Sequence, residues 1–195
     1  MFTGIVEELG EVVAVEQLED ASRFRLRGPL VTEGAQHGDS IAVNGVCLTV
    51  VEFGDGEFTA DVMAETLKRS SLGALDVGSR VKRLRLGGHI VQGHVDGTGT
   101  ILDRTPSEHW ELVKVGLPAH LSRYVVEKGS ITVDGVSLTV VEVADDWFTI
   151  SLIPTTLDLT TLGIKRSGDP VNLEVDVIAK YVERLLGTDA KENGK

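Results

Sequence analysis

A ten-residue stretch occurs twice in this chain: VNGVCLTVVE begins at Val43, and VDGVSLTVVE begins 90 residues later at Val133. The similarity extends without a gap from residues 39–73 to residues 129–163, and 17 of these 35 positions are identical. A solenoid needs about three or more repeats to bury its faces, so two copies are too few for one. The repeat therefore predicts two tandem copies of one small domain.

Length, charge and cysteine content agree with this organisation. The 195 residues suit two domains of about 90 residues each. The formal net charge of −11 argues against nucleic-acid binding, which needs a basic surface. A single cysteine excludes an intrachain disulfide and suits a reducing compartment. Neither a signal-peptide pattern nor an apolar run of roughly 18 residues is present, so we expect a soluble, cytoplasmic protein.

Each copy contains short runs of β-forming residues separated by Gly, Asn and Asp. Asn44-Gly45 divides one such stretch, and Asn-Gly is a strong hairpin signal because both residues accept a positive φ. Many short strands in a domain of this size favour a small closed barrel, which has no open edges. A β-sandwich is the alternative that the pattern leaves open.

The last segment follows a different pattern. In VIAKYVERLLG the apolar residues recur at the spacing of one face of an amphipathic helix: Ile178, Tyr181, Val182, Leu185 and Leu186. This segment lies outside both copies of the repeat. We therefore expect a helix whose apolar face packs on a barrel or on another subunit.

Seven segments, in order along nearly the whole chain, resemble the riboflavin synthase family: MFTGIVEE, NGVCLTV, ETLKRSSLG, GGHIVQGHVDGTG, EKGSITVDGVSLTV, SLIPTTLDLTTLG and VNLEVD. The resemblance implies an all-β fold of two tandem, homologous, six-stranded antiparallel Greek-key barrels followed by a C-terminal α-helix. It divides the chain into residues 1–86, 87–175 and 176–195. It also implies a homotrimer, leaves room for an association with lumazine synthase, and involves neither a metal nor a cofactor.

The resemblance further implies a transferase reaction. Two molecules of 6,7-dimethyl-8-ribityllumazine dismutate by transfer of a four-carbon unit, giving riboflavin and 5-amino-6-ribitylaminouracil. The alternative is a noncatalytic antenna protein of the same fold, which binds a lumazine or flavin without turnover. GHVDG, VSLTV and PTTL are all present in the second half, which favours the enzyme. A flavin reductase would need a glycine-rich nucleotide fingerprint, which does not appear.

If both substrates are the same molecule, a duplicated domain supplies two related pockets. We expect shared residues to bind the common ring and ribityl chain, and divergent residues to carry the reaction. Cys47 is aligned with Ser137, and thiols acidify more readily than hydroxyls. His94 is aligned with Ile5, and imidazole suits proton transfer near neutrality. Taken with the resemblance, the candidate catalytic residues are Cys47, His94, Ser40, Thr139 and Asp134.

Two of these candidates also have ordinary structural explanations. A lone cysteine in a strand, such as Cys47, is commonly a small core residue. Asp134-Gly135 is equally typical of a hairpin turn.

The residues that the resemblance assigns to substrate binding fall in both copies. They are Phe2, Gly4, Ile5, Val6, Cys47, Leu48, Thr49, Asp61, Val62, Met63, Ala64, Glu65, Thr66, Gly93, His94 and Val95, followed by Lys128, Ser137, Leu138, Thr139, Ser151, Leu152, Ile153, Pro154, Thr155 and Thr156. No metal ligands are expected among them.

The linker departs from the family pattern. Only KRLRL separates Val81 from Gly87, where the family has a longer segment. The departure bears on the last strand of the first barrel and leaves the pocket motifs intact. For His89, which follows the linker, a packing or ordering role is expected.

Overall fold

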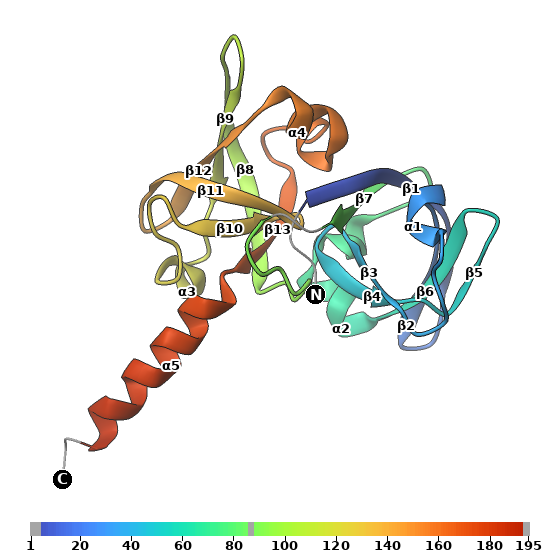
Figure 1. Ribbon diagram of the computed structural model, residues 1–195, viewed down its shortest axis with the longest axis horizontal. Helices are drawn as coiled ribbons and strands as arrows, with labels where there is room; N and C mark the ends of the chain where they lie inside the picture. The colour runs from blue at the N-terminus through green and yellow to red at the C-terminus, as the bar shows by residue number, and fades with distance from the viewer. Residues whose placement is uncertain (1–4, 86–87, 193–195) are drawn as a thin grey trace.

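The structure is a computed structural model that describes residues 5–85 and 88–192. Two β-rich halves lie side by side, and a helix extends from the second half (Figure 1). Phe2, Gly4 and the expected domain boundary between residues 86 and 87 lie outside the described residues. No helix in the described ranges is long and apolar enough to cross a membrane.

The elements follow the repeat. The first half contains β1 (Ile5–Gln17), β2 (Ala21–Arg27), α1 (Pro29–Thr32), β3 (Ser40–Val43), β4 (Val46–Thr49), β5 (Glu52–Gly54), β6 (Glu57–Met63), α2 (Ala64–Arg69), a 3₁₀ turn (Ser71–Ala74) and β7 (Arg80–Arg85). The second half contains β8 (Gly97–Pro106), β9 (Glu111–Gly116), α3 (Ala119–Ser122), β10 (Ser130–Val133), β11 (Val136–Val143), β12 (Trp147–Leu152), α4 (Pro154–Leu159), a 3₁₀ turn (Thr161–Gly163), β13 (Pro170–Val175) and α5 (Val177–Glu192).

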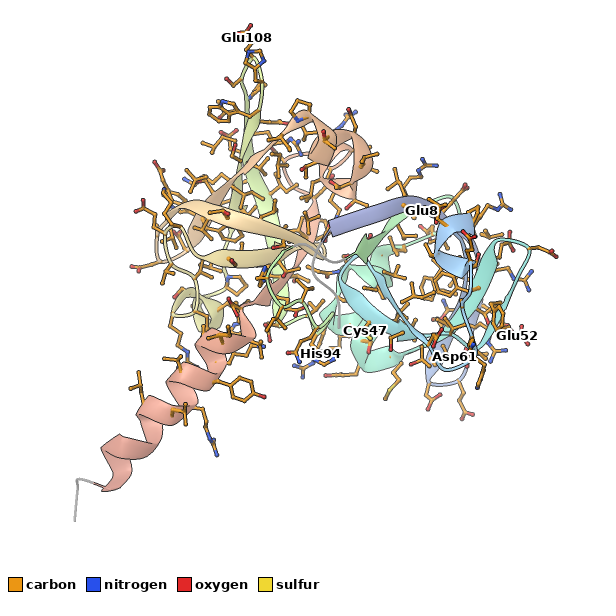
Figure 2. The ribbon with its side chains drawn as sticks, viewed as in Figure 1. Glu8, Cys47, Glu52, Asp61, His94 and Glu108 are labelled. Carbon is orange, nitrogen blue, oxygen red and sulfur yellow. The ribbon has the colours of Figure 1, made fainter. Side chains whose placement is uncertain are left out.

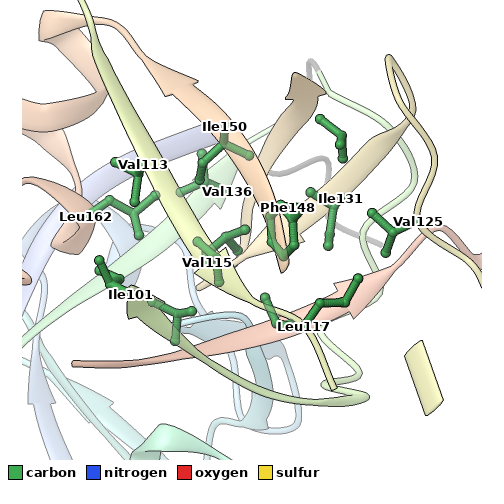
Figure 3. Close-up of a cluster of buried hydrophobic side chains, with 14 of the residues drawn as sticks. Ile101, Val113, Val115, Leu117, Val125, Ile131, Val136, Phe148, Ile150 and Leu162 are labelled. Carbon is green, nitrogen blue, oxygen red and sulfur yellow. The ribbon is translucent and has the colours of Figure 1, made fainter. Parts of the chain in front are cut away.

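The second half is a closed antiparallel barrel with the strand order β10-β11-β12-β9-β8-β13. Alternate residues point inward, as on β12, where Phe148, Ile150 and Leu152 are fully buried. Figure 3 shows Phe148 beside Val115 of β9 and Ile131 of β10. The closed barrel confirms the predicted fold class and excludes the β-sandwich.

The first half also has a buried apolar core, but its described strands do not form one continuous hydrogen-bonded barrel. Its strands form a five-stranded sheet, β5-β6-β2-β1-β7, and a separate hairpin, β3-β4. β13 buries Val171, Leu173 and Val175 along one face, whereas the equivalent positions of β7 are Val81, Arg83 and Arg85. Within the described residues, β3 has no hydrogen-bonded ladder to β7, while β10 pairs with β13.

The repeated sequence nevertheless gives repeated local structure. Asn44 and Asp134 both have a φ of 48°, and each precedes a glycine with positive φ in a two-residue hairpin loop. The predicted hairpin is thus confirmed in both copies.

The two halves meet through these hairpin turns. A Cβ added to Gly45 would lie 2.6 Å from the backbone nitrogen of Gly135, so only glycine fits at this contact. The buried side chain of Asn172 donates to the carbonyl of Asn44 at 2.8 Å and accepts from the N–H of Ser71 at 2.7 Å. The turns of both copies therefore form one polar interface between the barrels.

The predicted C-terminal helix is confirmed as α5, which points away from both barrels (Figure 1). Its first turns are held by ion pairs from Lys180 to Asp96 and from Glu183 to Arg123. The apolar stripe faces solvent: Ile178, Tyr181, Val182, Leu185 and Leu186 are 48–68% exposed. The helix therefore does not cover its own barrel with this face.

Candidate active site

A pocket of about 260 Å³ lies beside the first barrel. Its walls come from β4, from α2 and from the segment between β7 and β8. The lining residues are Val46, Cys47, Glu65, Thr66, Arg69, Ser70, Gly93, His94 and Val95. Figure 2 shows the side chains of Cys47 and His94 close together at this face. Six predicted residues meet here: Cys47, Glu65, Thr66, Gly93, His94 and Val95.

A backbone hydrogen bond joins the two repeats inside this pocket. The N–H of Cys47 donates to the carbonyl of Gly93 at 2.8 Å. Gly93 has a φ of 76°, and an added Cβ would lie 2.9 Å from the Cβ of Cys47. Only glycine permits this approach, which sets the adjacent His94 beside the thiol. The pocket of the first barrel is thus completed by the opening segment of the second copy.

Glu174, which sequence reasoning missed, accepts hydrogen bonds from the backbone of residues 92–94. The carboxylate is 3% exposed and accepts from the N–H groups of Gln92 at 2.6 Å, Gly93 at 2.9 Å and His94 at 3.0 Å. Burial raises the pKa of Glu174, and the three backbone donors oppose this shift by stabilising the charge. The signal available in the sequence was a glutamate between two core residues, Leu173 and Val175.

The α2 wall carries an ion pair between Arg69 and Glu65. The Arg69 guanidinium lowers the pKa of Glu65 chiefly by hydrogen bonding to its carboxylate. The positions equivalent by the repeat are Leu159 and Thr155, so this charged wall is special to the first copy. Arg69 was absent from the predicted site, although its difference from Leu159 was visible in the repeat.

Other predicted residues of the first copy lie outside the pocket lining. The Asp61 carboxylate pairs with Arg23 through bonds of 2.6 and 2.9 Å, and this hydrogen bonding lowers the pKa of Asp61. Leu48 and Val62 are buried in the first core. Ser40 and Thr49 face each other across the β3-β4 ladder. Met63 and Ala64 are exposed at the start of α2, and Ile5 and Val6 begin β1.

Ser137, the counterpart of Cys47, forms a hydrogen bond with His89, which follows the linker. The Nδ1 of His89 lies 2.7 Å from the Ser137 hydroxyl, and its Nε2 lies 3.1 Å from the hydroxyl of Thr132. Burial lowers the pKa of His89, and the nearby Asp176 charge opposes this shift. His89 therefore orders the β10-β11 hairpin, in line with the expected ordering role.

The remaining predicted residues of the second copy lie on β11, on the β12–α4 junction and in the loop before β10. β1, which Ile5 and Val6 begin, contacts α4 and β11 of the second half. Leu138 and Leu152 belong to the core, while Thr139 is exposed. Lys128, with a φ of 63°, donates through Nζ to the carbonyl of Val141. Residues of the β12–α4 junction are exposed except for Leu152, which is buried, and Thr156, which is half-buried: Ser151, Leu152, Ile153, Pro154, Thr155 and Thr156.

Asp134 is absent from the lining of the first-barrel pocket. Its carboxylate is fully buried, 2.6 Å from Lys165 Nζ, and accepts from the hydroxyl of Thr161 at 3.2 Å and the N–H of Asn172 at 2.8 Å. These partners belong to the second copy, and one of them, Asn172, also donates through its side chain to the carbonyl of Asn44 in the first half.

Groups of three or more His, Cys, Asp or Glu side chains arranged to hold a metal ion are not found within residues 5–85 and 88–192. The pocket chemistry described above therefore consists of a thiol, an imidazole, a hydroxyl, an ion pair and backbone groups.

Comparison with known proteins identifies the same two repeats. The family model of the lumazine binding domain matches residues 3–82 and 92–176. The chain is 66% identical over 197 residues to riboflavin synthase from Mycobacterium tuberculosis, covering 95% of this chain and 98% of the relative. It is 43% identical over 193 residues to riboflavin synthase from Bacillus subtilis, covering 95% and 90% of the two chains.

A solved structure shares the fold. LumP complexed with 6,7-dimethyl-8-(1'-D-ribityl) lumazine superposes with a TM-score of 0.83 at 27% identity, covering 90% of this chain and 99% of that chain. The sequence identities of 66% and 43% to the two riboflavin synthases exceed the 27% identity to LumP. Together with the matched repeats, these relationships show that the chain belongs to the riboflavin synthase family, a family of transferases built from two lumazine-binding domains.

Proposed function

We propose that each barrel of this chain binds one molecule of 6,7-dimethyl-8-ribityllumazine, and that four-carbon transfer between the two gives riboflavin and 5-amino-6-ribitylaminouracil. One observation carries the proposal: the pocket beside β4 brings the divergent residues Cys47 and His94 together with the shared residues Thr66 and Gly93. Binding groups and reactive groups therefore meet in one cavity.

The shared residues suit the part of the ligand that both substrates have in common. The hydroxyl of Thr66 can donate to and accept from a polyol, and backbone groups match the imide edge of the ring. Exposed serine and threonine side chains at the β12–α4 junction offer the same chemistry on the second barrel. LumP, which has the same fold, is known in complex with this lumazine and with riboflavin.

The divergent residues suit the reacting atoms. The reaction requires removal of a proton from the C7 methyl of one lumazine and addition of a nucleophile or water at C7 of the other. His94 is exposed in the pocket and supplies the base, while Cys47 supplies the group that adds or that positions the ring. Ser40 and Thr139 lie on the outer faces of their hairpins, where they can contact a second substrate. Asp134 supports the site through the interface between the barrels.

We further propose that the chain acts as a cytoplasmic homotrimer in which the first barrel of one subunit faces the second barrel of another. The exposed apolar stripe of α5 supports this assembly, because 48–68% exposure of five large apolar side chains on one helix face is costly in water. The opposed pockets would bring donor and acceptor together.

Incubation with the lumazine alone tests this function. Purified protein with a chelator and no other additive should form riboflavin and the pyrimidinedione in equal amounts, measured by chromatography with absorbance detection. Tight binding without any turnover would instead indicate an antenna protein.

A further inference from the structure

We propose that Glu174 is a positioning residue for the first-barrel pocket, holding the backbone of Gln92–His94 against Cys47 so that the pocket is formed before substrate binds. This inference rests on the proposed function. Glu174 lies on β13 of the second barrel and is absent from the pocket lining.

The contacts that support this role are directed at the backbone. One carboxylate oxygen accepts from Gln92, and the other accepts from both Gly93 and His94. Three successive N–H groups around one anion form a concave backbone site whose hydrogen bonds fix the path of the chain. The neighbours of Glu174 on β13 are 0% and 2% exposed, so the carboxylate stands on a rigid strand.

The same segment is anchored at its other end. One Asp96 oxygen accepts from the N–H of Val175 at 3.0 Å, and the other pairs with Lys180 Nζ at 2.5 Å. The Gly93 carbonyl is then presented to the N–H of Cys47. β13 and α5 therefore hold both ends of the wall that carries His94. A wall held in this way lowers the entropy lost when a ligand binds.

The only cysteine of the chain lies in this pocket and reports on it selectively. The experiment measures the alkylation rate of Cys47 by iodoacetamide in the full-length protein, with increasing 6,7-dimethyl-8-ribityllumazine. In Glu174→Gln the carboxamide cannot accept from all three N–H groups, because its NH₂ group is a donor. The concentration that protects half of the Cys47 should rise roughly tenfold, as expected for loss of a charge-assisted hydrogen bond.

Glu111→Gln is the matched control. Glu111 also accepts two charge-assisted hydrogen bonds, from Arg104, but it begins β9 and is absent from the pocket lining. The control should leave half-protection within about twofold of the parent. Equal half-protection in the parent and Glu174→Gln, or an equal rise in the control, would overturn the positioning role.

A second variant covers the case in which Glu174→Gln fails to fold. Glu174→Asp keeps the charge on a shorter side chain, so it should show a smaller rise in the half-protecting concentration than the roughly tenfold rise expected for Gln. An unchanged value would count against the proposal. If the lumazine fails to protect Cys47 even in the parent protein, the proposed function of the pocket itself is wrong, and this outcome differs from equal protection in all variants.

Discussion

The side-chain amide of Asn172 on β13 donates to the backbone carbonyl of Asn44 in the first barrel at 2.8 Å, and all of its partners are buried. The same amide nitrogen donates to the hydroxyl of Ser71, and the amide oxygen accepts from the N–H of Ser71. The residue equivalent to Asn172 in the first copy is Lys82, so the repeat does not supply this amide a second time. The Asn172 side chain therefore supplies three of the hydrogen bonds that join the two barrels.

Replacement of Asn172 by alanine should destabilise the protein by about 3 kcal/mol, because buried donor and acceptor groups of Ser71 and Asn44 lose their partner. Urea unfolding measures this change. Thr98→Ala is the control, since Thr98 is the exposed cross-strand neighbour of Asn172 and should change stability by less than about 0.5 kcal/mol. Similar losses in both variants would contradict the role of the buried amide.

Replacement of Asp134 by asparagine should cost about 3 kcal/mol, because Lys165 is left without its buried partner. Asparagine accepts the positive φ of this position, as Asn44 does in the first copy. The turnover of the protein that remains folded should be unchanged, measured well below the unfolding midpoint. A large loss of turnover in fully folded protein would show that Asp134 acts in catalysis.

Replacement of Cys47 by serine makes the first copy resemble the second at this position. Turnover should fall about tenfold, because a hydroxyl is the poorer nucleophile. The lumazine affinity should change by less than about threefold, because the two side chains differ little in size. Steady-state kinetics combined with fluorescence titration separates the two effects. Full turnover in this variant would show that the cysteine serves packing alone.

Replacement of His94 by glutamine should lower turnover by about 100-fold while the Michaelis constant stays nearly unchanged, because glutamine keeps hydrogen-bonding groups but cannot accept a proton near neutral pH. His109→Gln is the control, since His109 lies at the exposed tip of the β8-β9 hairpin. A raised Michaelis constant as the sole defect of His94→Gln would assign His94 to binding.

His89 should make stability depend on pH. Burial lowers the pKa of His89 below its usual 6.5, so the unfolded chain binds more protons than the folded chain as the pH falls through this range. The groups facing the ring are the hydroxyls of Ser137 and Thr132 and the charge of Asp176. The stability lost in His89→Gln should therefore be greatest above pH 6.5 and should shrink as the pH falls through the lowered pKa. Urea unfolding from pH 5 to 8 would measure it, and a constant difference would contradict it.

The repeat allowed much of this fold to be predicted from sequence, because hairpins and strand alternation are local properties. The Asn44-Gly45 turn, the closed second barrel and α5 are examples. The missing hydrogen-bonded ladder between the described residues of β3 and β7 was not predicted, because the repeat by itself implies that both halves close in the same way.

The site was predictable only where the resemblance supplied it. Cys47 and His94 meet because Gly93 touches β4, and Asp134 is buried because Lys165 and Asn172 reach it from elsewhere in the chain. Contacts of this kind join residues up to 128 positions apart, as between Asn44 and Asn172, so no local pattern encodes them. The role of Glu174 could not be predicted for the same reason, because its partners at residues 92–94 are distant in the sequence.

The missing ladder between β3 and β7 within residues 5–85 should affect local opening of the first half. β10 is hydrogen-bonded on both sides, to β11 and β13, whereas β3 has a ladder only to β4 in the described part of the chain. Amide hydrogens along β3 should exchange with deuterium sooner than those of β10, although the two strands descend from one sequence. The two copies should therefore differ in how readily their equivalent strands open. Cys47 lies in the copy that should open more readily, on the strand that pairs with β3.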